Sequence, residues 1–251
     1  MRIRSSNPYF GRIEKAQGLE ATIGEEKLAS YKGIFLKTLL LVAVLLISGL
    51  GSIFLFALPY NIVIGILIAC PIVALVCAIF GSFNLKYASF LSIIYSLAEG
   101  LMLGLLTYVL DRAYPGVGIV AIIGVGVVFL VTFALYAFKA IRVSNFFVRL
   151  FSILGVSIFI AFLLSFLISW LAPAAYAAIA DNFWLMLVIY SVLIIFGAFC
   201  LILDFDRCHQ IVIAQSPKKY EWWAAFGLII SIIWIYIQIL RLVTLITGRR
   251  N

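Results

Sequence analysis

Three carboxylates stand within or directly beside long apolar stretches of this chain: Glu99, Asp204 and Asp206. Glu99 lies near the middle of the apolar run Ser89–Leu110, and the two aspartates follow the run Phe183–Leu203. An acidic side chain at membrane depth is energetically costly, and it marks a functional site by default. Such a group can bind a cation or carry a proton. These three carboxylates are therefore the candidate ion-handling residues.

Glu99 has no evident ionic partner in the sequence. Lys86 lies about 20 Å away along the same predicted helix at 1.5 Å per residue, and Arg241 belongs near the far end of the last apolar run. We expect Glu99 to be protonated, hydrogen-bonded or exposed to a water-filled cavity. Two interpretations stay open: a neutral glutamic acid that bonds across helices, and a group that handles ions or protons.

Asp204 and Asp206 should point to different sides of one helix. Residues two apart on a helix do not share a face, so one can look into a bundle while the other meets Arg207 and the cytosol. The uncharged continuation Ile211–Ala214 indicates that the helix extends past the pair and encloses it in part. The alternative is an ordinary solvated helix end.

The elements that must position these groups are seven apolar helices. The chain has 251 residues, of which 66% are hydrophobic and 11% charged, and a bilayer is spanned by about 20 mainly apolar residues. The runs are continuous rather than alternating, which favours helices over a barrel. The sequence thus predicts an all-α, seven-helix membrane bundle, with runs at Phe35–Ala57, Tyr60–Phe80, Ser89–Leu110, Val117–Phe138, Leu150–Leu171, Phe183–Leu203 and Trp222–Ile246.

The charge pattern predicts the orientation of this bundle. The net charge of +8 reflects lysines and arginines that gather in the N-terminal tail and in alternate loops, which favours a cytosolic N terminus and does not indicate a nucleic-acid partner. We expect residues 1–36 to form a cytosolic tail and residues 37–251 the transmembrane domain, in the plasma membrane if the source is bacterial. Arg249 and Arg250 at the other end can reach lipid headgroups.

Several enzyme classes lack their residues here. His209 is the only histidine, so a zinc site of the H-E-x-x-H type is excluded and a serine–histidine–aspartate triad has little scope. The last run offers Gln238 but no aspartate for an intramembrane aspartic protease, and no lysine for a retinal. We therefore expect no catalysis and no bound cofactor. The four cysteines have no metal-site spacing and should act as small apolar residues.

Six segments with recognisable motifs follow one another along the chain: Arg4–Pro8, Tyr95–Gly104, Ala140–Val143, Leu203–Asp206, Lys219–Leu228 and Ile235–Leu242. No single motif suffices, but together they cover nearly the whole chain. Their order and spacing resemble the bacterial, YccA/YetJ-like branch of the Bax inhibitor-1 family.

The resemblance implies a seven-helix bundle with the last helix near its centre. It also implies a pH-sensitive leak for calcium or another cation, gated by an acidic pair between the sixth and seventh helices. Asp204 matches the sixth-helix acid and becomes a candidate calcium ligand, whereas the seventh-helix acid falls on Gln238, which does not ionise. The second-helix arginine of well-studied members has no counterpart in the run Tyr60–Phe80.

Geometry adds a difficulty for a contact between Asp204 and Gln238. Counted from a turn at Ser216-Pro217, two straight helices would place these residues on levels about 13 Å apart. Asp206 or Glu99 is then the alternative working partner of Asp204. The prediction is an ion-leak protein with calcium or protons as permeant or regulating ions. The other class left open is a non-conducting regulator that binds another membrane protein, such as a membrane protease.

Overall fold

The structure is a computed structural model that describes residues 28–57, 59–141 and 143–249. Most of the predicted tail, including Arg4–Pro8, lies outside the described residues, as do Arg142 and Arg250. Within the described part the chain is helical, without a strand beyond an isolated bridge between Leu28 and Pro217. The helices are α2 (Tyr31–Gly51), η1 (Ser52–Ala57), α3 (Tyr60–Phe83), α4 (Ala88–Ala113), α5 (Val117–Ala137), α6 (Asn145–Leu171), α7 (Pro173–Ala180), α8 (Phe183–Ile213) and α9 (Lys219–Gly248).

Among the described residues, seven helical stretches are long and apolar enough to cross a membrane, which confirms the predicted fold class. The first begins at Tyr31, inside the segment expected to be tail. Ser30 explains this start, because its Oγ accepts a hydrogen bond from the Gly33 amide at 3.0 Å and caps the helix. Helix α8 continues to Ile213, so it extends beyond the two aspartates as the sequence predicted.

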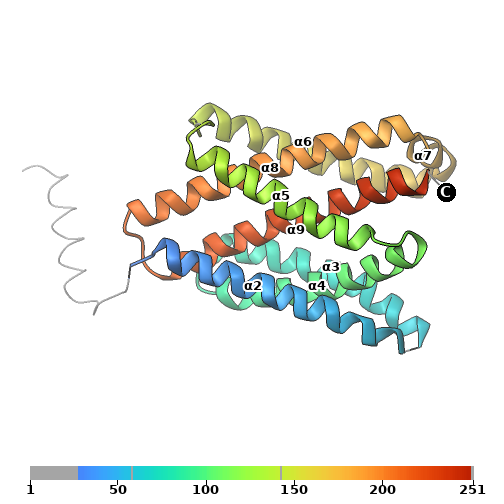
Figure 1. The fold of residues 1–251 in the computed structure, drawn as a ribbon, viewed down its shortest axis with the longest axis horizontal. Coiled ribbons are helices and arrows are strands. Elements are labelled where there is room, and N and C mark those ends of the chain that lie inside the picture. The colour runs from blue at the N-terminus through green and yellow to red at the C-terminus, as the bar shows by residue number, and fades with distance from the viewer. Residues whose placement is uncertain (1–27, 58, 142, 250–251) are drawn as a thin grey trace, which may run out of the picture.

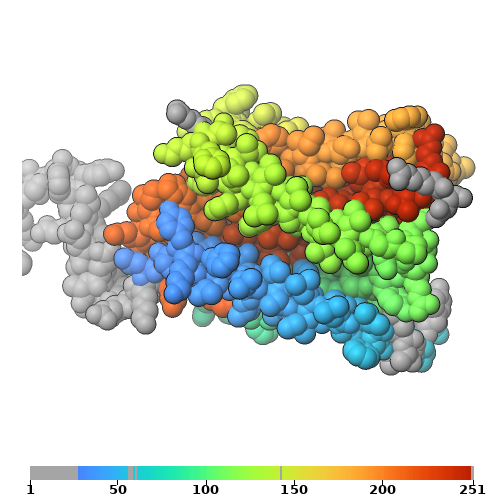
Figure 2. Space-filling model, in the orientation of Figure 1, coloured from blue at the N-terminus to red at the C-terminus, as the bar shows by residue number. Residues whose placement is uncertain are grey.

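Helix α9 occupies the centre of the bundle, as the resemblance implied. It packs against α2, α3, α4, α5 and α8, and in Figure 1 it runs between the α2–α4 group and the α6–α8 group. Figure 2 shows α2 and α5 covering much of α9 on one face. Its buried apolar residues contribute to both hydrophobic clusters, Ile235 to one and Phe226 to the other.

Helix α6 lies at the edge of the bundle. None of its described side chains is buried, and it packs against α7 and α8. The contacts to α8 are mainly aromatic, with the ring of Phe151 stacked on Phe196 and tilted against Phe199. The connection between α6 and α8 contains a short helix, α7, started by Pro173 at its first position.

Helices α2 and α4 approach closely through small residues. A Cβ atom added at Gly100 would collide with Ser48 Oγ and the Leu45 carbonyl, and one at Gly104 would collide with the Gly49 carbonyl. Gly100 and Gly104 have the small-xxx-small spacing that allows two membrane helices to approach this closely.

The two ends of the bundle differ in charge. Helices α2, α4, α6 and α9 begin at one end, which we name the basic end because it carries Lys86, Lys139, Lys218 and Lys219. The hairpin between α8 and α9 projects at this end past the ends of α5 and α6 (Figure 1). The functional candidates on α8 therefore lie near the base of a projecting hairpin.

Candidate functional site

Asp204 is buried at the basic end of the bundle, with 6% of its surface exposed. Two groups hold its carboxylate. Ser231 of α9 donates a hydrogen bond from Oγ to Oδ2 at 2.5 Å. Arg207, one turn along α8, donates from Nη1 to Oδ1 at 3.2 Å. The pair is asymmetric, because the arginine side chain is 54% exposed while the aspartate side chain is 7% exposed. A buried carboxylate thus has a largely exposed counter-ion.

A cleft of about 330 Å³ opens beside this carboxylate. Helices α3 and α8 do not contact each other within the described part of the chain, so the cleft lies between them over α9. Asp204 and Arg207 line one side and Ser82 of α3 the other. Gly227 of α9 keeps the floor low, since a Cβ there would lie 3.3 Å from Asp204 Oδ1. The lining is completed by Trp223, Ala224, Phe226 and Ile230.

Gln238 is not the partner of Asp204. It lies on α9 two turns beyond Ser231, a rise of about 10 Å, and Ser231 takes the facing position. Gln238 is buried, 2% exposed, and its Oε1 has no hydrogen-bond partner among the described residues. The sequence analysis missed Ser231, although the level difference counted from the turn at Ser216 was a signal against Gln238.

Asp206 points away from Asp204, as the helical spacing predicted. Its Oδ1 accepts a hydrogen bond from Tyr136 Oη of α5 at 3.3 Å, and its Oδ2 accepts one from Gln210 Nε2 at 2.6 Å. Asp206 does not line the cleft. The structure therefore separates the two aspartates into a buried site over α9 and a half-buried site beside α5.

Glu99 lies half-buried on α4, away from the cleft. Its Oε2 is buried and has no hydrogen-bond partner among the described residues, and the same holds for Oγ of Ser96 one turn earlier. The described residues form only two ion pairs, Lys37–Glu221 and Arg207–Asp204. Neither pair includes Glu99, so no cationic partner for Glu99 is found among the described residues.

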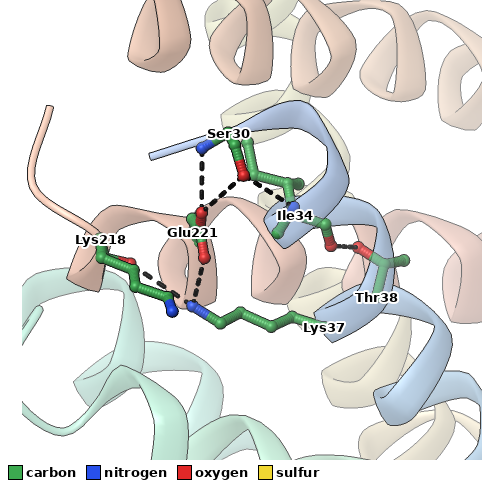
Figure 3. A network of polar contacts seen from close by, with 7 residues as sticks. Ser30, Ile34, Lys37, Thr38, Lys218 and Glu221 are labelled. Carbon is green, nitrogen blue, oxygen red and sulfur yellow. Dashed lines mark hydrogen bonds and ion pairs between the residues drawn. The ribbon is translucent and has the colours of Figure 1, made fainter. Parts of the chain in front are cut away.

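A fourth acidic residue, Glu221, is more deeply buried than the three candidates, with 1% of its surface exposed. Its Oε1 accepts hydrogen bonds from the amide of Ser30 at 2.9 Å and from its hydroxyl at 3.2 Å. Its Oε2 pairs with Lys37 Nζ at 2.7 Å. Figure 3 shows how this network joins the start of α2 to the start of α9. We name Ser30, Lys37 and Glu221 the entry clamp.

The members of the entry clamp are far apart in the chain, so no local sequence pattern indicates them. Glu221 stands at the polar start of a span, and nothing near it in the sequence indicates that Ser30 covers it. Lys37 also lies 5.1 Å from the centre of the Trp222 ring. The neighbouring Trp223 donates its Nε1 hydrogen to the Ser82 carbonyl at 3.1 Å, so the start of α9 is fastened on two sides.

The remaining polar candidates make structural contacts. His209 Nδ1 lies 2.6 Å from Tyr31 Oη, and the two rings stack, which fastens α8 to α2. The described residues contain no group of three potential metal ligands of the His, Cys, Asp or Glu type. All four cysteines are free thiols that lie within helices.

The resemblance noted in the sequence is confirmed by comparison with family models. The Bax inhibitor 1 like model matches residues 7–248, which is nearly the whole chain. The chain belongs to this family. Comparisons with curated proteins and with solved structures give no match. The family membership, together with seven long apolar helices, makes the chain a multi-pass integral membrane protein.

In this Bax inhibitor 1 like chain, the contacts of Asp204 differ from the acidic pair that the resemblance implied. The position that faces Asp204 from the last helix carries a serine, and the arginine that pairs with Asp204 comes from the same helix, one turn away. The site therefore contains one carboxylate, one hydroxyl and one guanidinium.

Proposed function

We propose that this protein conducts a weak, pH-sensitive leak of calcium or another cation across the membrane, with Asp204 as the gating and ion-binding group. The observation that carries the proposal is a buried carboxylate whose counter-ion, Arg207, is more than half exposed at a cleft. An ionisable group at membrane depth that lines a cavity is typical of an ion or proton pathway.

Arg207 serves in this proposal as a replaceable cation. While Asp204 is ionised, the guanidinium occupies one carboxylate oxygen and Ser231 the other. A proton on Asp204 removes the attraction for Arg207, and a metal ion competes with it for the same oxygen. Since Arg207 is exposed, it can swing toward water without unpacking the bundle. The equilibrium between these states would set the leak.

The donor set at Asp204 suits a passing ion better than a tightly held one. Calcium takes six to eight oxygen ligands, whereas the side chains that line the cleft offer one carboxylate, Asp204, and one hydroxyl, Ser82. The buried hydroxyl of Ser231 donates to Asp204 and does not line the cleft. Water would have to supply most of the shell. The cleft is roomy enough for several water molecules, because it far exceeds the space that one requires.

Flux into liposomes tests this proposal. Purified protein is reconstituted at known density, a calcium-sensitive dye is enclosed, and the initial flux is measured from pH 5 to pH 8 against empty liposomes. A protein-dependent flux that changes with pH is expected. Flux indistinguishable from empty liposomes at every pH would contradict the leak.

The alternative function is a non-conducting regulator that binds another membrane protein, such as a protease. The feature that favours it is α6, which has no buried side chain among its described residues and packs against α7 and α8, with one ring contact from Phe162 to Trp234 of α9. Such a peripheral helix is available to a partner. A chain without flux but with a specific partner cross-linked to cysteines on α6 would establish this second function.

A further inference from the structure

We propose that the cleft beside Asp204 is a binding site for a membrane phospholipid, whose phosphodiester is held by Arg207 and whose acyl chain lies over Gly227 and Ile230 of α9. The proposal concerns lipid binding and holds whether or not the protein conducts ions. Three observations support it: the depth of the cleft in the membrane, the unused hydrogen-bond donors of Arg207, and a lining with one charged and one apolar part.

The cleft lies at the depth of the lipid headgroups. Tyr136, next to the last residue of α5, contacts Asp206 of α8, and Ser82, next to the last residue of α3, lines the cleft. Both of these apolar spans therefore end at the level of Arg207. Spans end where hydrocarbon gives way to headgroups, so Arg207 stands at the level of the lipid phosphates of that leaflet.

Arg207 has hydrogen-bond donors to spare. Asp204 accepts from Nη1 alone, and the guanidinium makes no other hydrogen bond to the described residues. A guanidinium carries five N–H groups in a planar fork that matches phosphate oxygens. It can therefore donate to the buried carboxylate from one edge and to a phosphodiester from the other.

The rest of the lining matches an acyl chain. Below Arg207 the floor on α9 is apolar, with Phe226, Gly227 and Ile230, while Asp204 lines the α8 side at this depth. Because α3 and α8 do not touch within the described part, this surface faces the lipid side of the bundle. Trp223 stands at the mouth with its ring nitrogen tied to Ser82, and tryptophan favours the membrane interface. The headgroup of one lipid would thus lie at Arg207 and its acyl chain over the apolar residues of α9.

Native mass spectrometry of the full chain in mild detergent tests this site with phosphatidylglycerol as the probe. The variants are Arg207→Gln and Ile230→Trp, the second of which fills the apolar part without changing charge. Lys139→Gln is the matched control, because Lys139 is an exposed cation at the basic end that does not line the cleft. Retention of the parental elution volume and melting temperature verifies that each variant is folded.

The tightest lipid adduct should weaken about tenfold in Arg207→Gln, the factor expected for one charge-assisted hydrogen bond. Ile230→Trp should lose the same adduct, and Lys139→Gln should retain it. Soluble glycerol phosphate should compete poorly, because it lacks the acyl chain. Equal adducts in the parent and in both cleft variants would overturn the site, as would equal loss in Lys139→Gln or full displacement by glycerol phosphate. None of these outcomes depends on ion flux.

Discussion

At the scale of single residues, the resemblance implied an acidic pair between the sixth and seventh helices, whereas the structure shows a single acid with two hydrogen-bond donors. Asp204 is held by the hydroxyl of Ser231 and the guanidinium of Arg207. Sequence reasoning could find Asp204 because an acid beside an apolar run is conspicuous. It could not find Ser231, because serine is unremarkable in a membrane helix and its role follows only from how α8 and α9 align across their turn.

A new acid at position 231 should change the titration, whereas one at position 238 should not. In Ser231→Asp, two carboxylates would stand within hydrogen-bond distance and share a proton, so the pH profile of flux should broaden into two steps. Gln238→Glu places the acid two turns away and should leave the profile close to that of the parent. The profiles are measured by liposome flux. A broadened profile in Gln238→Glu alone would contradict the pairing with Ser231.

The entry clamp should contribute strongly to stability. Glu221→Gln leaves the Lys37 ammonium partly buried without its ionic partner, and removal of one member of a buried pair costs about 3–5 kcal/mol. Because the Lys37 side chain keeps 14% exposure, we expect the lower end of that range. Lys218→Gln is the control, since Lys218 contributes only its backbone carbonyl. Thermal unfolding in detergent should show a large decrease for the first variant and little change for the second.

At the scale of elements, sequence patterns predicted the spans well and their ends less well. Runs of apolar residues specify a membrane helix because nothing else satisfies the backbone in lipid. Ends depend on caps and on tertiary contacts. Ser30 starts α2 early, with Glu221 covering it from the other end of the chain, and α8 and α9 extend beyond the apolar runs into a projecting hairpin. A short window of sequence reveals neither the contact between Ser30 and Glu221 nor the extension of α8 and α9.

Gly100 should be intolerant of any side chain, because α2 lies directly against it. Gly100→Ala would place a methyl group on Ser48 Oγ and the Leu45 carbonyl, and forced overpacking of this kind costs about 1–3 kcal/mol. Gly65→Ala on α3 is the matched control, since a Cβ there meets nothing within 4 Å. Melting curves in detergent should separate the two. Equal stability would mean that α2 and α4 are further apart than described.

At the scale of the whole molecule, the bundle is organised around α9. Its contacts with five other spans explain why the resemblance to a family with a central last helix was a sound guide to the fold. The same arrangement leaves α3 and α8 apart and so creates the cleft. Sequence could specify which helices exist, but this gap follows from packing among segments more than a hundred residues apart.

The basic end should face the cytosol. The expectation rests on the concentration of lysines there, since positively charged loops are retained inside. In a cysteine-free background, Asp181→Cys should react with an impermeant thiol reagent added to intact cells. Lys139→Cys should react only after the cells are opened. The reverse pattern would place the basic end and the cleft on the outer side and contradict this orientation.

The most direct measurement is the pH profile of calcium flux in liposomes for Asp204→Asn beside Asp206→Asn. Both changes remove one carboxylate from the same turn of α8, but only Asp204 lines the cleft and pairs with Arg207. Asp204→Asn should abolish most of the pH dependence, because asparagine cannot gain or lose the proton. Asp206→Asn should keep most of it. A parental profile in Asp204→Asn, or its loss in Asp206→Asn alone, would contradict the assignment of Asp204 as the gate.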